Sequence, residues 1–177
     1  MQSPQLSTLH TVCGRFGPGR LPKAEKPDIG AGYAAAAAAV VATVCYGLAV
    51  SIGAVVGMDG FGGMVNLAFA GFALPFVVPA AFLVGVIGWR YSPSYTPLTG
   101  VVGGGLGAIL TYLVTMLFVG VVLTVSAVLS LSGADPTSAA TFSIGLVAIA
   151  FTVTWWVTIP IGCLAGYLYV TAVDSET

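Results

Sequence analysis

The stretch that decides the fold is Pro97 to Leu131, which begins Pro-Leu-Thr-Gly-Val-Val-Gly-Gly-Gly-Leu-Gly-Ala and contains no charged residue. About 20 apolar residues are enough for one helix to cross a bilayer, and this run is longer. Thr96-Pro97 supplies a start signal, because a threonine hydroxyl can cap a helix and proline suits the first helical position. The sequence therefore predicts a transmembrane helix over 97–132.

Three further apolar runs accompany this helix, over about 29–58, 64–89 and 136–172. Asp28 is placed to cap the first run, and Asp135-Pro136 repeats the cap-then-proline signal before the last. We therefore predict an all-α fold, an integral membrane bundle of four transmembrane helices in one domain over 29–173. The third and fourth spans exceed the bilayer thickness, so they are expected to tilt, kink or project beyond it.

The composition identifies lipid as the solvent of this chain. Only 6% of the 177 residues are charged and 58% are hydrophobic, with a mean hydropathy of +1.03. A soluble domain carries about 25% charged residues, which this surface lacks. The net charge of -1 and the absence of a large basic patch argue against a nucleic-acid partner.

The positive charges predict the orientation in the membrane. Residues 1–28 hold four of the five Lys and Arg residues, and we predict a solvated, disordered basic tail there. The fifth, Arg90, follows the second span, and residues 174–177 form an acidic C-terminal tail. With four spans these segments share one side, so the positive-inside rule predicts a cell-membrane protein with both termini in the cytoplasm.

Glycines recur along one side of the predicted third helix. At about 100° per residue, positions i, i+3, i+4 and i+7 share a face, and in lipid such faces associate by close backbone approach. We predict a helix-packing face made of Gly100, Gly103, Gly104, Gly107, Thr111 and Thr115. Packing within the chain is the favoured interpretation, and a homo-oligomer contact is the alternative. A phosphate loop is disfavoured because no Lys-Ser/Thr pair follows the glycines.

A second candidate region lies in the fourth span. Tryptophan normally prefers the membrane interface, but the two tryptophans here would lie deep if the span is centred near Val157. Neighbouring threonines and carbonyls freed by proline could then bond an indole N–H. The candidate lining of a pore or lipophilic site is Thr154, Trp155, Trp156, Thr158 and Pro160, with Pro75 and Pro79 in the second span. The alternative is a shifted register that leaves both rings near the interface.

The spans contain no Asp, Glu, Lys, Arg or His, and this absence limits the chemistry. Coupled transporters usually keep such a group at membrane depth, and catalysis needs an acid, a base or metal ligands. The three cysteines show no metal-binding spacing. We therefore predict no catalytic residue, no metal site and no cofactor, and a protein that is not an enzyme.

The spans rich in Ala, Val, Gly and Thr, the aspartates at turns and the ending Asp174-Ser-Glu-Thr177 resemble those of haloarchaeal multi-pass membrane proteins. This resemblance implies no site residue. The expected function is that of an accessory or assembly subunit of a membrane complex. The alternative is a channel or carrier for a small neutral or lipophilic solute. Expected partners are the lipid bilayer and either a second copy of the chain or other membrane subunits.

Overall fold

The protein consists of four long helices in the computed structural model, which describes residues 26–56, 62–91, 96–129 and 135–174. They are α2 (Pro27–Val55), α3 (Gly62–Tyr91), α4 (Pro97–Leu129) and α5 (Pro136–Asp174), and these ranges contain no strand. Each helix is long and apolar enough to cross a membrane. The predicted all-α bundle of four such helices is confirmed.

The helix starts show which local signals were informative. α4 begins at Pro97 and α5 at Pro136, as the cap-then-proline pairs predicted. α2 begins at Pro27, so the prediction that Asp28 caps it is wrong. Asp28 lies in the first turn, where its Oδ1 accepts a hydrogen bond from the amide of Ile29 at 2.9 Å. The predicted tails over 1–28 and 174–177 lie outside the described residues at 1–25 and 175–177, but Pro27 and Asp28 belong to α2 and Asp174 to α5, so the predicted tail boundaries are corrected there.

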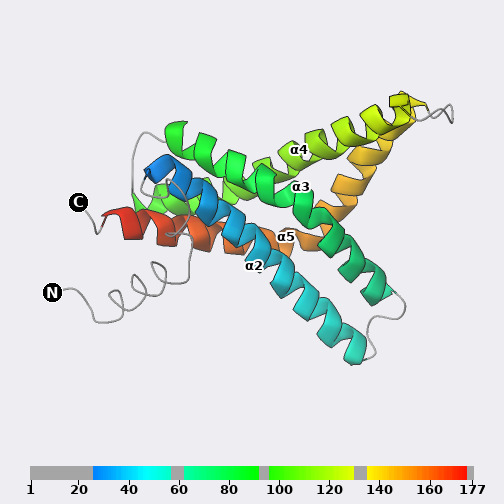
Figure 1. Cartoon of the computed structure of the whole chain (residues 1–177). Helices are drawn as coiled ribbons and strands as arrows, with labels where there is room; N and C mark the ends of the chain where they lie inside the picture. The colour runs from blue at the N-terminus through cyan, green and yellow to red at the C-terminus, as the bar shows by residue number, and fades with distance from the viewer. Residues whose placement is uncertain (1–25, 57–61, 92–95, 130–134, 175–177) are drawn as a thin grey trace.

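The four helices form two antiparallel hairpins, α2–α3 and α4–α5, that meet at one end and diverge at the other (Figure 1). We call the end where α2 and α4 begin the joined end, and the end where they finish the open end. α3 also contacts α4, and α2 contacts α5, so the two hairpins form one body. The divergence leaves the inner faces of the hairpins apart toward the open end (Figure 1).

Polar and aromatic contacts fasten the joined end. An Arg90 nitrogen lies 2.9 Å from an Asp28 carboxylate oxygen, which links α3 to α2. The hydroxyl of Tyr169 on α5 donates to the carbonyl of Pro27 at 2.6 Å. The same tyrosine packs edge-on against Trp89, with ring centroids 4.9 Å apart. Three of the four helices are thereby tied together at this end.

Proline explains the change of direction of α5, which Figure 1 shows partway along the helix. Pro160 lies inside α5 and has no N–H, so the carbonyl of Trp156 loses its helical hydrogen bond and the helix can bend. This bend lets the outer half of α4–α5 turn away from α2–α3. α3 carries Pro75 and Pro79 inside its length for the same chemical effect.

Apart from Tyr46, the buried hydrophobic residues are alanines and valines, whereas many large apolar side chains are exposed. Phe72 is 73% exposed and Leu117 is 61% exposed. In lipid an exposed apolar side chain carries no penalty, and helices pack through small residues instead. The buried hydrophobic residues are Ala31, Ala42, Tyr46, Ala80, Ala81, Val84, Val147, Val157 and Val170.

Candidate functional site

The glycines of α4 and α5 bring the backbones of these two helices into contact. A Cβ atom added to Gly100 would lie 2.6 Å from the carbonyl oxygen of Gly166, and one added to Gly162 would lie 2.7 Å from that of Gly104. Real Cβ atoms do not come this close to other heavy atoms. Glycine is therefore required on both helices, and each of these four residues faces backbone of the partner helix.

The predicted helix-packing face is divided in the structure. Gly103 is exposed, and a Cβ there would meet no atom within 4 Å. A Cβ at Gly107 would lie 3.8 Å from Cγ1 of Val84 on α3, an ordinary contact. The prediction of a single face is thus corrected, because Gly103 and Gly107 lie about 60° around the helix from Gly100 and Gly104.

The sequence prediction missed the α5 half of this contact. Gly162-Cys-Leu-Ala-Gly166 has the same four-residue spacing as Gly100 and Gly104. Two such pairs on adjacent helices are the usual sequence sign of close helix packing in lipid.

A cavity of about 1130 Å³ lies between the inner faces of the hairpins and is lined by all four helices. We call it the inter-hairpin cleft, and its lining includes Tyr46, Phe76, Gly103, Tyr112 and Thr154. Pockets for small molecules span roughly 300–1,000 Å³, so this one could hold a large lipophilic molecule. Its described lining residues contain no Asp, Glu, Lys, Arg or His.

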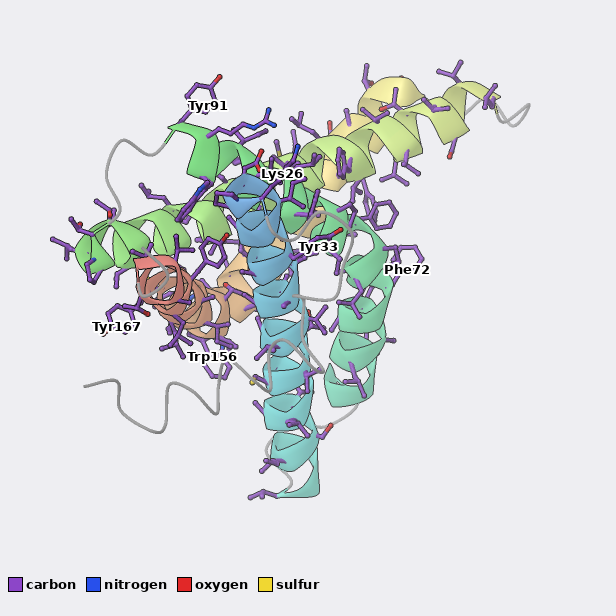
Figure 2. The ribbon with its side chains drawn as sticks, turned by 60° about the vertical axis from the view of Figure 1, so that its left-hand side comes forward. Lys26, Tyr33, Phe72, Tyr91, Trp156 and Tyr167 are labelled. Carbon is purple, nitrogen blue, oxygen red and sulfur yellow. The ribbon has the colours of Figure 1, made fainter. Side chains whose placement is uncertain are left out.

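Aromatic rings contribute to the outer part of the cleft. Phe69, Phe72 and Phe76 of α3 are spaced so that they share one side of that helix, and all three line the cleft. Figure 2 shows Phe72 on the side of α3 that faces the diverging outer half of α4 and α5. The cleft therefore presents a broad apolar wall toward its open end.

Three hydroxyl groups gather on the wall formed by α4 and α5. The hydroxyl of Tyr112 lies 2.5 Å from Oγ1 of Thr154 and 3.0 Å from Oγ1 of Thr158. We call these three residues the hydroxyl cluster, and all three line the cleft. The ring of Tyr112 packs edge-on against Phe151 at 5.1 Å. Both threonines are among the predicted lining residues, whereas Tyr112 is not, although a tyrosine deep in an apolar helix needs a polar partner.

The two other predicted threonines also lie on the cleft. Thr111 donates from its hydroxyl to the carbonyl of Gly107 at 2.8 Å, a common arrangement within a helix. Thr115 is only 7% exposed, and its hydroxyl oxygen has no hydrogen-bond partner among the described residues. The predicted α4 threonines thus face the space between the hairpins.

The remaining predicted lining residues lie outside the cleft, which corrects that part of the prediction. Trp155 and Trp156 are about half exposed, and Nε1 of Trp156 donates to the carbonyl of Val153 at 2.7 Å. Residues four apart share a helix face, so Thr154 and Thr158 line the cleft while the tryptophans between them point elsewhere. Figure 2 shows Trp156 beside α5. The exposed residues Pro75, Pro79 and Pro160 also lie outside the lining.

The chemistry available in the cleft is apolar contact and hydroxyl hydrogen bonding. Among the residues that the structure describes, no group of three His, Cys, Asp or Glu side chains could hold a metal ion. The described lining offers hydroxyl groups but no base or acid to activate them.

Four apolar helices thus surround a large cleft that carries hydroxyl groups on one wall. Comparison of the chain with protein-family models, with curated proteins and with solved structures finds no match.

Proposed function

We propose that this multi-pass membrane protein is non-enzymatic and binds a small neutral or lipophilic molecule in the inter-hairpin cleft, as a carrier or channel for such solutes. The observation that supports this proposal is the apolar cavity of about 1130 Å³ lined by all four helices. A charged solute would lose its hydration there without gaining an ionic partner, which is unfavourable. A neutral apolar molecule would exchange lipid contacts for protein contacts without that penalty.

The proposed orientation places the joined end of the bundle in the cytoplasm. Lys26 and Arg90 lie beside the ends of α2 and α3 at this end, and cytoplasmic segments of membrane proteins are enriched in positive charge. The cleft would then widen toward the external leaflet. A tag on either terminus should therefore resist a membrane-impermeant reagent in intact cells. Labelling of such a tag would contradict this orientation.

The test of solute binding uses purified protein in liposomes and a long-chain alkyl methyl ether that carries a photoreactive diazirine. We expect photolabelling of cleft residues on α3 and α4, with competition by the unlabelled ether. Gly103→Leu should reduce labelling roughly tenfold, because the new side chain would take up cleft space that the bound probe needs. Such overpacking costs about 1–3 kcal/mol. The site of this change is open, so the variant is expected to fold.

Gly71→Leu is the matched control for this experiment. A Cβ at Gly71 also meets no atom within 4 Å, but Gly71 does not line the cleft. It should leave labelling unchanged. Equal labelling of wild type and Gly103→Leu, or labelling confined to residues outside the cleft, would overturn the proposed function.

A second candidate function is that of an accessory or assembly subunit, which the exposed aromatic residues of the cleft favour. Phe72 on one hairpin is 73% exposed and Phe142 on the other is 63% exposed, and both line the cleft. An apolar helix of another subunit could cover them. Native mass measurement after mild detergent extraction distinguishes the two functions. A stoichiometric co-purifying protein supports the subunit role, and a monomer that retains only small molecules supports solute binding.

A further inference from the structure

We infer that the hydroxyl cluster recognises the head group of a neutral lipophilic molecule that donates a hydrogen bond, such as a long-chain alcohol or amide. This inference rests on the proposed function, because it names the chemical class of the molecule that the cleft would bind. The evidence is the set of hydrogen bonds that Tyr112, Thr154 and Thr158 make, together with the absence of charged side chains among the described residues that line the cleft.

The protons of the cluster are already committed within the protein. Thr154 donates its hydroxyl proton to the carbonyl of Ala150 at 2.7 Å, and Thr158 donates to the carbonyl of Thr154 at 3.1 Å. A carbonyl cannot donate, so the direction of both bonds is fixed. Because the Thr154 proton goes to Ala150, the single phenolic proton of Tyr112 is donated to Oγ1 of Thr154, and the 3.0 Å contact with Thr158 uses no further tyrosine proton. No hydroxyl proton of the cluster is left for a ligand.

The capacity that remains in the cluster is for accepting hydrogen bonds. A hydroxyl oxygen can accept through two lone pairs while it donates its proton. A hydroxyl that donates within a chain of hydrogen bonds also becomes a stronger acceptor, because the bonds polarise one another. Tyr112 donates to Thr154, which donates in turn to Ala150, so the Tyr112 oxygen ends such a chain at the cleft wall.

The surroundings of the cluster select a neutral donor over a charged one. An ammonium group would also donate, but the described lining residues of the cleft supply no carboxylate to balance its charge. An unpaired charge in an apolar site is strongly unfavourable, whereas an alcohol or amide needs only hydrogen-bond partners. The apolar remainder of the ligand would lie against the aromatic wall that includes Phe76.

The test compares a matched pair of probes that differ only in the donor. The probes are a diazirine-bearing long-chain alcohol and its methyl ether, each competed against photolabelling of the protein in liposomes of one composition. A net hydrogen bond contributes about 0.5–1.5 kcal/mol, so the alcohol should bind roughly two- to tenfold more tightly than the ether. Comparison of this ratio between variants removes differences in how the two probes partition into the bilayer.

Tyr112→Phe should lower the alcohol-to-ether ratio to about one while leaving ether binding unchanged. Unchanged ether binding also shows that the variant is folded. The matched control is Thr43→Val, which removes a cleft hydroxyl outside the cluster whose proton is likewise given to a carbonyl, that of Ala39 at 2.9 Å. This control should keep the wild-type ratio.

The possible failures are distinguishable. If neither probe binds the wild-type cleft, the proposed function fails and the inference falls with it. If both probes bind equally well, or if Tyr112→Phe keeps the preference, the inference alone is overturned. Loss of the preference in Thr43→Val but not in Tyr112→Phe would place the recognition at another hydroxyl and would also overturn it.

Discussion

Within each hairpin, glycines let the two helices pack closely, but the atoms that these glycines face differ between α4–α5 and α2–α3. In α4–α5, Gly104 and Gly162 face each other, so backbone meets backbone on both sides. In α2–α3, a Cβ on Gly32 would meet side-chain atoms, including a Phe82 ring atom at 2.9 Å. Among the described glycines of this hairpin whose surroundings are known, Gly85 alone faces a backbone oxygen, that of Ala31 at 2.7 Å. A side chain can rotate away from an added methyl group, but a helix backbone cannot. The α4–α5 hairpin should therefore tolerate substitution less well.

Gly104→Leu should give the largest effect, because the new side chain would enter the backbone of α5 at Gly162. We expect a loss of more than about 3 kcal/mol in the free energy of unfolding, or failure to fold. Unfolding in mixed detergent micelles measures this change. Gly103→Leu, one residue away in open space, should remain folded.

Ile109→Ala is the second control for this comparison, since Ile109 is 40% exposed and should change stability by less than about 0.5 kcal/mol. Equal tolerance of Gly104→Leu and either control would refute the backbone contact between α4 and α5.

Replacing one contact glycine in each hairpin by alanine compares the two hairpins through smaller changes in the free energy of unfolding. Gly104→Ala should destabilise by about 1–3 kcal/mol, since the backbone of α5 must move. Gly32→Ala should cost less than about 1 kcal/mol, because Phe82 and Val86 can shift and alanine favours the helix. The same micelle unfolding experiment compares both. Adding Val86→Ala should restore part of the stability lost in Gly32→Ala. A larger loss of stability in Gly32→Ala than in Gly104→Ala would contradict the expectation that α4–α5 is the less tolerant hairpin.

The helix caps give the smallest expected difference, which separates the two helices of the α4–α5 hairpin from each other. The hydroxyl and amide of Thr137 donate to the Asp135 carboxylate before α5, and these hydrogen bonds hold the pKa of Asp135 below its ordinary value. A lowered folded-state pKa means that the cap stabilises fully above the unfolded-state pKa and is lost as pH falls through the folded-state pKa. The start of α4 uses the neutral hydroxyl of Thr96, which does not titrate in this range.

An NMR titration of the Asp135 carboxyl carbon tests the cap of α5. It should show the low pKa in wild type and a rise toward the ordinary value in Thr137→Ala. If the titration midpoint of Asp135 is the same in Thr137→Ala as in wild type, the proposed cap is contradicted. Order at the start of α4 should stay constant over the same pH range.

Local signals predicted the helices well, and contacts between helices were predicted less well. Pro97 and Pro136 mark helix starts because the restriction of proline acts on its own residue and its neighbours. Gly104 was predicted to lie in a packing face from its spacing, but nothing in that spacing says which neighbour it meets. Tyr112 was missed because its two threonine partners lie more than 40 residues away in the sequence.

The sequence by itself determined four long apolar helices, the start points of α4 and α5, and a solvent of lipid instead of water. These properties follow from composition, hydrophobic length and capping, each of which acts within a few turns of helix. Only the tertiary structure decided that Gly100 and Gly104 pair with α5 while Gly103 opens onto a cleft, and that Trp155 and Trp156 lie outside that cleft. In lipid, small differences in backbone approach select the helix partners, and those distances exist only after the helices have packed.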